Sequence, residues 1–196
     1  SHVTSAWDIA LMSRQLLTQH PDIKKFTTIW MDTVRDGAFG LSNTNKLVRF
    51  YSGATGLKTG FTTGAGYCLS ASAQRDGMEL VAVVMGCETS QERFQACKSL
   101  LDFGFANYET YRVSGGACEI PVVGSDVESI KVSWGDLAIP VRKGSCSRIQ
   151  AEHILPERVQ APLQAGECVG QIRYTLDGEE IGSTKILCER EAEKIG

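Results

Sequence analysis

Hydrophobic and polar positions divide the chain into a first part with helical and strand patterns and a second part with strand patterns only. Small and apolar residues recur at helical spacing near the start, which predicts a helix over residues 4–18. Ser5 with Asp8 three residues later resembles a capping box at the start of this helix. His20-Pro21 predicts its end, because the residue before a proline avoids helical backbone angles.

A β-hairpin is predicted in the middle of the chain. Residues 68–74 and 79–86 are strand-like and are separated by Asp76-Gly77, a strong turn signal. The return strand is a nearly continuous apolar run, which predicts a strand buried on both faces. Residues 58–62 are predicted to add a third antiparallel strand beside residues 68–74, so that they lie along the edge of a sheet covered by helices.

A second helix is predicted to begin at Thr89, with Glu92 three residues on as its capping partner. An apolar stripe follows that can pack on the sheet, formed by Phe94, Cys97, Leu101 and Phe105. Gly104 near the end of this stripe predicts a C-terminal stop. Arg93 is expected to point off the stripe, where the plainest interpretation is a solvated helix charge.

Beyond residue 110 the pattern becomes strand-like. Ser114-Gly115-Gly116 is interpreted as a linker. Alternating segments at residues 130–134, 138–141 and 169–176, with a turn signal at Asp177-Gly178, predict a small antiparallel sandwich. The predicted fold class is therefore α+β, with one domain over residues 1–110 and an all-β domain over residues 111–196.

Composition and charge exclude several function classes. The chain has 196 residues, 42% of them hydrophobic, and a formal net charge of -3, without a basic run that would bind nucleic acid. It contains no apolar run long enough to span a bilayer. The seven cysteines include no Cys-x-x-Cys pair, so we expect core thiols and no zinc site or other metal.

The sharpest chemical signal is Lys58-Thr59-Gly60 on the predicted edge strand. Alternation along a strand places Lys58 and Gly60 on one face and Thr59 on the other. A cation and a hydroxyl beside bare backbone suit an anionic ligand laid along the edge, with Gly60 allowing close approach. The triplet alone is also consistent with a polar turn that leads into a strand.

The context of this triplet resembles a known enzyme family. Lys-Thr-Gly is the third active-site motif of penicillin-binding proteins and serine β-lactamases. More closely, residues 43–47, 56–62 and 65–69 resemble the D-alanyl-D-alanine carboxypeptidases, low-molecular-weight penicillin-binding proteins of serine peptidase family S11. The resemblance implies part of a transpeptidase-like domain, an antiparallel sheet with helices, followed by the all-β C-terminal domain of these enzymes.

The resemblance also implies roles for individual residues, with no cofactor. Lys58, Thr59 and Gly60 would bind the terminal carboxylate end of a peptidoglycan stem peptide, or the matching carboxylate of a β-lactam inhibitor. The backbone N–H of Phe61 would form half of an oxyanion hole. Arg93 would help to hold the same carboxylate, a task that suits a planar guanidinium.

Two motifs of the family do not occur in this sequence. No serine has lysine three residues on, and there is no Ser-x-Asn. In the family both lie upstream of Lys-Thr-Gly, so we interpret the chain as the C-terminal part of a serine carboxypeptidase, inactive alone. The alternative is a non-catalytic cell-wall binding or scaffold protein that retains the strand.

The resemblance further implies a location and further partners. The complete enzyme would work outside the cytoplasm, in the cell envelope, and would rest on the membrane through a C-terminal anchor, which the sequence here does not contain. A half-domain would expose apolar sheet and helix faces, so self-association of this chain is expected.

Overall fold

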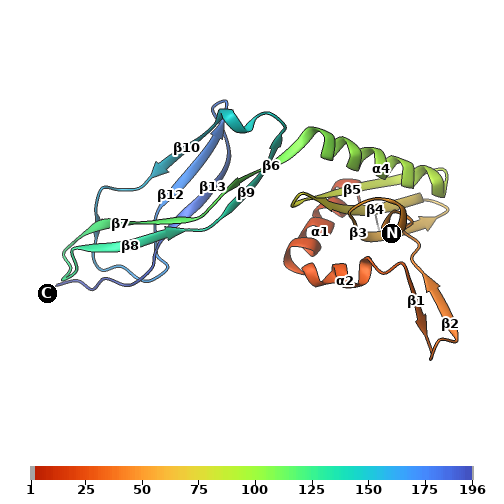
Figure 1. Cartoon of the computed structure of the whole chain (residues 1–196), viewed down its shortest axis with the longest axis horizontal. Coiled ribbons are helices and arrows are strands. Elements are labelled where there is room, and N and C mark those ends of the chain that lie inside the picture. The colour runs from red at the N-terminus through yellow and green to blue at the C-terminus, as the bar shows by residue number, and fades with distance from the viewer. Residues whose placement is uncertain (1–2, 196) are drawn as a thin grey trace. The chain divides into compact units, whose positions relative to one another are not determined.

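The computed structural model describes residues 3–195 and divides the chain into two compact units, Ser1–Asn107 and Tyr108–Gly196. The first unit combines helices with a small antiparallel sheet, and the second is built almost wholly of strands (Figure 1). The predicted α+β fold class is confirmed.

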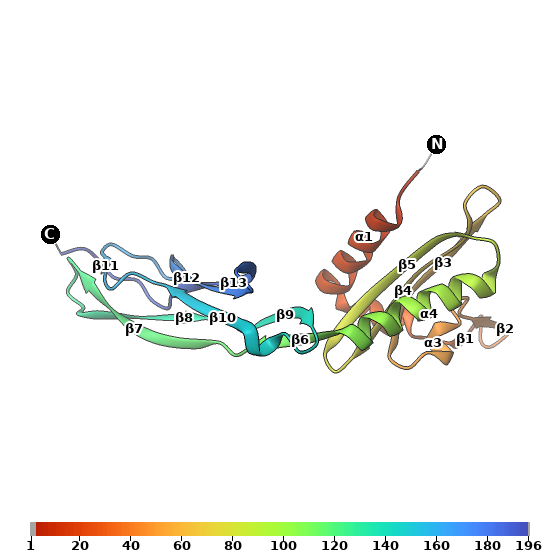
Figure 2. The same cartoon turned by 90° about the horizontal axis from the view of Figure 1, so that it is seen from above.

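The elements of the first unit follow one another in short segments. In chain order they are α1 (Ala6–Gln19), a 3-10 turn η1 (Pro21–Ile23), α2 (Lys24–Thr27), β1 (Met31–Val34), β2 (Phe39–Ser42), α3 (Leu47–Phe50), β3 (Ala54–Thr62), β4 (Gly66–Arg75), β5 (Met78–Cys87) and α4 (Ser90–Asn107). Helices α1 and α4 lie on opposite faces of the sheet formed by β3, β4 and β5 (Figure 2).

The capping box of α1 and its end before His20-Pro21 are as predicted, although the helix spans Ala6–Gln19 and not residues 4–18. The Asp8 backbone N–H donates to the Ser5 hydroxyl oxygen at 3.1 Å, and the Ser5 backbone N–H donates to the Asp8 carboxylate at 3.2 Å. This reciprocal box satisfies N–H groups that have no partner within the helix. His20 caps the C-terminus directly before Pro21.

The sheet has the order β3-β4-β5, all antiparallel. Strands β4 and β5 form the predicted hairpin around Asp76-Gly77, both of which have positive φ. Strand β3 lies at the sheet edge, as predicted. The prediction of a doubly buried return strand is wrong, because Ala82 is the only fully buried residue of β5, while β4 lies between its two neighbours and buries residues 69–73.

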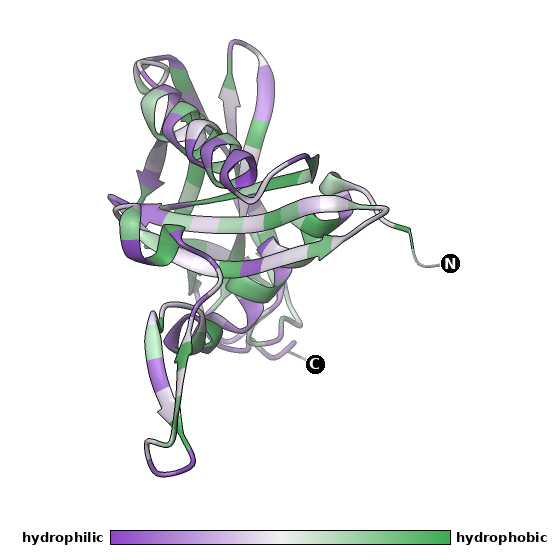
Figure 3. Ribbon diagram, turned by 90° about the vertical axis from the view of Figure 1, so that its right-hand side faces the viewer, coloured by the Kyte–Doolittle hydropathy of each residue, from purple (hydrophilic) through white to green (hydrophobic). Residues whose placement is uncertain are grey.

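Helix α4 covers one face of the sheet. Thr89 caps it, accepting a bond from the Glu92 N–H at 3.1 Å. Cys97 and Leu101 are buried in the core of the unit, and hydrophobic and hydrophilic positions alternate along the helix (Figure 3). Gly104 does not end α4, contrary to the prediction, since the helix runs on to Asn107. A Cβ at Gly104 would lie 2.4 Å from Leu80 Cδ1, so this glycine allows the helix to approach β5 closely.

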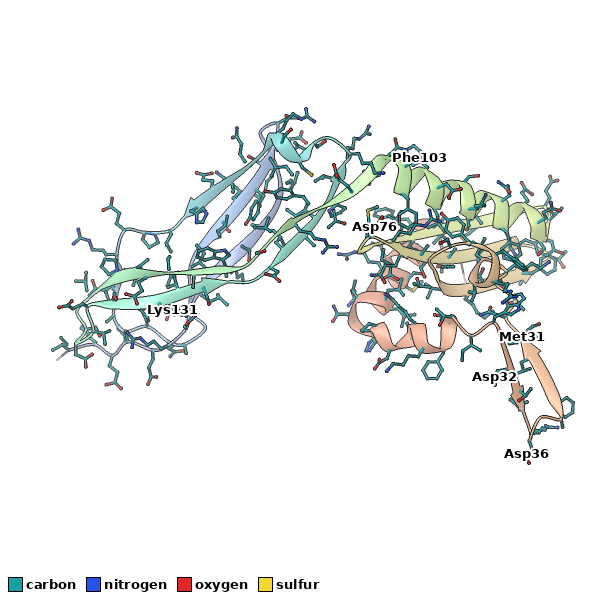
Figure 4. The ribbon with its side chains drawn as sticks, in the orientation of Figure 1. Met31, Asp32, Asp36, Asp76, Phe103 and Lys131 are labelled. Atoms are coloured by element: carbon teal, nitrogen blue, oxygen red, sulfur yellow. The ribbon has the colours of Figure 1, made fainter. Side chains whose placement is uncertain are left out.

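The hairpin β1–β2 and helix α1 expose large apolar side chains. The hairpin extends away from the rest of the first unit, as the labelled Met31, Asp32 and Asp36 show (Figure 4). On α1, Trp7 is 71% exposed and Met12 57%. Within residues 3–195, none of the helices is long and apolar enough to cross a bilayer.

The second unit is a two-layer β structure. Its strands are β6 (Tyr108–Val113), β7 (Gly116–Val123), β8 (Ser129–Trp134), β9 (Leu137–Arg142), β10 (Ile149–Ile154), β11 (Val159–Gln160), β12 (Cys168–Leu176) and β13 (Glu179–Cys188), with a 3-10 turn η2 (Cys146–Arg148). One sheet has the order β10-β12-β13-β8-β7-β11, and β6 pairs with β9 in the other. The predicted hairpin turn at Asp177-Gly178 joins β12 to β13.

The second unit has its own apolar core. Ile130, Ile172 and Ile186 are almost completely buried in it, and residues of β6 and β9 pack against them. Ser114-Gly115-Gly116 does not link the two units, contrary to its interpretation, because it joins β6 to β7. A Cβ at Gly115 would lie 2.5 Å from the Trp134 carbonyl oxygen, so this glycine serves close packing.

Candidate functional site

The Lys58-Thr59-Gly60 triplet lies on the exposed part of β3. Lys58 and Gly60 are exposed and Thr59 is half-buried. Because β3 pairs with β4 alone, its other edge has no strand partner among the described residues. The Lys58 ammonium donates to the Thr59 carbonyl oxygen at 2.8 Å, and it has no ion-pair partner within residues 3–195. An exposed cation therefore lies on a strand edge that has no strand partner among the described residues.

Cross-strand partners show which face each side chain occupies, because directly opposite residues share a face. Lys58 is opposite Ser70, whose hydroxyl bonds to that of Ser13 in α1 at 2.8 Å. Phe61 is opposite Tyr67, and their ring centroids are 4.4 Å apart. The Lys58 side chain is thus on the α1 side of the sheet.

Gly60 has room for a side chain within its own unit. A Cβ there would meet only the Cβ of Cys68, at an ordinary contact distance of 3.9 Å, and φ is not positive. Neither packing nor backbone conformation in the first unit therefore requires glycine at this position. Close approach of a ligand to the strand would account for it.

Arg93 is buried against β3 and β4, so the interpretation as a solvated charge is wrong. It is only 7% exposed. Its Nη1 donates to the carbonyl oxygens of Gly60 at 3.1 Å and Cys68 at 3.3 Å, and its Nη2 donates to the Ser90 hydroxyl at 3.2 Å. The guanidinium also lies over the Tyr67 ring, 5.2 Å from its centroid. One side chain of α4 thus fixes the backbone of the motif strand.

The structure adds a residue that the sequence did not single out. Thr44 and Thr59 hydroxyl oxygens are 2.7 Å apart. Thr44 lies in the segment between β2 and α3. Its position within the block of residues 43–47, which carries the family resemblance, was the available signal, but spacing alone does not indicate a contact with residue 59.

Of the thiols near the site, only Cys97 lies in the core of the first unit, whereas Cys68 and Cys87 are half-buried, contrary to the expectation of core thiols. Burial raises the pKa of Cys97 to about 12, with Cys87 adding to the effect. The Cys97 thiol contacts the carbonyl oxygens of Leu69 and Ala82. Burial also raises the pKa of Cys87, and the Glu92 carboxylate adds to that increase. Both groups are therefore protonated thiols at neutral pH and not nucleophilic thiolates. Among residues 3–195, no three His, Cys, Asp or Glu side chains gather as metal ligands would.

Arg93→Ala is expected to lower the free energy of unfolding of the first unit by about 2–4 kcal/mol, because the buried side chain leaves a cavity and two carbonyl oxygens and Ser90 lose their donor. Urea unfolding followed by tryptophan fluorescence measures the change. Arg49→Ala removes an exposed arginine of α3 and serves as the control, with an expected change under about 0.5 kcal/mol. Equal stability of the two variants would contradict a structural role for Arg93.

Comparisons with known proteins agree over both units. Residues 1–89 match the family model for D-alanyl-D-alanine carboxypeptidase, and residues 117–194 match that for the penicillin-binding protein 5 C-terminal domain. The chain is 34% identical to D-alanyl-D-alanine carboxypeptidase DacF of Bacillus subtilis, covering 100% of this chain and 52% of that protein. It is 32% identical to DacA of Escherichia coli strain K12, covering 96% of this chain and 48% of that protein.

A solved structure shows the same fold. Penicillin binding protein 5 from Haemophilus influenzae superposes with a TM-score of 0.83 at 32% identity, covering 97% of this chain and 57% of that one. The chain thus spans about half the length of the curated relatives that it matches.

Proposed function

The chain belongs to the family of D-alanyl-D-alanine carboxypeptidases, and on this premise we propose that its complete gene product removes the terminal D-alanine of peptidoglycan stem peptides. The observation that carries the proposal is the Lys58-Thr59-Gly60 segment on an edge strand, where a cation and a hydroxyl lie beside an edge without a strand partner among the described residues. The substrate is a peptide that ends in D-Ala-D-Ala, and β-lactams are its inhibitory mimics.

The reaction proceeds through an acyl-enzyme. A serine from a part of the protein outside these 196 residues attacks the penultimate carbonyl and forms an ester. The C–N bond to the terminal residue breaks, and D-alanine leaves with the proton that its amine requires. Water then hydrolyses the ester and restores the serine. The chain described here supplies binding and charge stabilisation for these steps.

Four consecutive residues of β3 bind the ligand or stabilise charge on it. The Lys58 ammonium and the Thr59 hydroxyl bind the terminal carboxylate, and Gly60 lets the substrate backbone approach the strand. The Phe61 backbone N–H donates to the oxyanion that forms at the attacked carbonyl. Loss of one such donor typically raises the barrier by about 3 kcal/mol. Since Phe61 acts through its backbone, its side chain, which is 56% exposed, is free to vary.

Arg93 contributes to the same carboxylate site from helix α4. A guanidinium has five N–H donors, and the contacts to Gly60, Cys68 and Ser90 use three of them. Of the two that remain, the buried Nε has no partner among the described residues. Arg93 therefore adds positive charge, and a limited number of donors, to a strand whose position it also fixes.

The setting proposed for the complete protein is the cell envelope, outside the cytoplasm, where its substrate is located. Its membrane association is peripheral and depends on a C-terminal anchor beyond the sequence described. No nucleic-acid partner is proposed. The exposed apolar side chains of α1, among them Trp7 and Met12, support self-association of this chain when it is produced by itself.

Release of D-alanine tests the proposal. The complete gene product is expected to liberate D-alanine from a tripeptide that ends in D-Ala-D-Ala, detected with a D-amino-acid oxidase assay, and to leave the L-Ala-L-Ala peptide intact. Co-sedimentation with purified peptidoglycan, measured in parallel, tests the alternative that the protein binds the cell wall without catalysis. Binding to the polymer without D-alanine release would favour the non-catalytic scaffold protein.

A further inference from the structure

We propose that Thr44 is a positioning residue that turns the hydroxyl of Thr59 toward the carboxylate of the ligand. The inference rests on the proposed function, because it concerns the same anionic ligand. Its geometric basis is the 2.7 Å distance between the two hydroxyl oxygens, which joins the segment before α3 to the motif strand.

The segment that carries Thr44 is fixed by its two asparagine neighbours. The Asn43 amide donates to the carbonyl oxygens of Thr27 at 3.2 Å and Ile29 at 3.0 Å. The Asn45 N–H donates to Asn43 Oδ1 at 2.9 Å, and the Leu47 N–H donates to Asn45 Oδ1 at 3.2 Å. Asn45 is fully buried. Thr44 is therefore an exposed hydroxyl on a backbone held on both sides.

The direction of the hydrogen bond between Thr44 and Thr59 decides whether the Thr59 proton is available to a ligand. Each hydroxyl has one proton to donate and two lone pairs that accept. If Thr44 donates to Thr59, the Thr59 proton stays available for an anion. If Thr59 donates to Thr44, it presents only lone pairs to the ligand, and these repel a carboxylate. An anionic ligand therefore selects the first arrangement, in which Thr44 keeps the Thr59 proton directed outward.

The surroundings favour an anion over a neutral group. Lys58 is adjacent on the strand, and the Arg93 guanidinium bonds to the Gly60 carbonyl directly after Thr59. A hydroxyl donor on a strand that carries Lys58 and is bonded by Arg93 binds a carboxylate more strongly than an ester, because hydrogen bonds to charged acceptors are roughly twice as strong as neutral ones. The contribution of Thr44 is thus tied to ligand charge.

The test compares Thr44→Val, which removes the hydroxyl and keeps the shape, with Thr44→Ser, which keeps the hydroxyl. In the complete gene product, the second-order rate of acylation is measured with a penicillin and with its methyl ester. Thr44→Val is expected to react about three- to tenfold more slowly with the free acid, the range for one hydrogen bond, and to lose less with the ester. Thr44→Ser is expected to retain the wild-type rate.

Thr33→Val is the matched control, because Thr33 is an exposed hydroxyl of β1 on the same unit. If Thr44→Val reacts with the free acid at the wild-type rate, the inference is overturned and the proposed function is not affected. Equal losses with acid and ester, or a loss in Thr44→Ser as large as that in Thr44→Val, would also overturn it. A wild-type protein that reacts with neither compound would overturn the proposed function together with the inference.

Discussion

The 196-residue chain by itself is expected to gain no mass when incubated with a penicillin, whereas its complete gene product is expected to gain the mass of one drug molecule. The reason is the position of the serines. None has lysine three residues on. Ser70, the cross-strand partner of Lys58, is only 8% exposed, and its hydroxyl is bonded to that of Ser13. A buried hydroxyl that is bonded to another hydroxyl, and not to a base, is a poor nucleophile.

Intact-mass spectrometry over a time course measures both proteins under the same conditions. The control for specific acylation is the complete protein with its Ser-x-x-Lys serine changed to alanine, which is expected to gain no mass. A covalent adduct on the 196-residue chain that disappears in Ser70→Ala would show that this chain carries its own nucleophile. No adduct on a folded complete protein would remove the catalytic roles of Lys58 and Thr59.

Lys58→Ala in the complete protein is expected to slow both penicillin acylation and peptide hydrolysis by roughly 10- to 100-fold. This is the range for losing one hydrogen bond to a charged group, about 1.5–3 kcal/mol. The free energy of unfolding is expected to change by less than about 0.5 kcal/mol, because the exposed ammonium bonds only to the Thr59 carbonyl within the described residues. Stopped-flow acylation and thermal unfolding measure the two effects.

Lys143→Ala is the matched control, since Lys143 is an exposed lysine of the second unit. It is expected to leave the acylation rate unchanged. A large loss of thermal stability in Lys58→Ala, with a proportional loss of rate, would assign Lys58 to the structure of the strand instead of to the ligand. A full rate in Lys58→Ala would contradict its proposed role directly.

Local signals in the sequence predicted the local elements well. The capping pairs of α1 and α4 and the turn at Asp76-Gly77 follow from interactions between residues a few positions apart. The edge position of β3 followed from the pairing of β4 with β5 on one side, which leaves β3 on the other side of β4. In each case the physical cause lies within about ten residues of sequence, so the pattern alone indicates it.

Failures arose where the cause is distant in sequence. Gly104 was predicted as a helix stop, but its partner is Leu80, 24 residues earlier. Arg93 was interpreted as solvated because helical spacing does not reveal the carbonyl oxygens of Gly60 and Cys68 that it meets. The apolar run of β5 was interpreted as doubly buried, but most of its side chains are only half-buried between α1 and α4, because pattern alone does not show how completely the helices cover them. Thr44 was missed because its partner, Thr59, is also distant from it in the sequence.

The hydrogen bonds of Arg93 also show which residues must accompany this motif if it is transferred to another protein. Lys58-Thr59-Gly60 is three residues long, but its backbone is held by β4 on one side and by the first turn of α4 beneath. A graft of the triplet onto another sheet would lack these supports. A transferable module therefore contains at least residues 54–107 together with the segment that carries Thr44, so inheritance and engineering both act on the motif as a supersecondary structure.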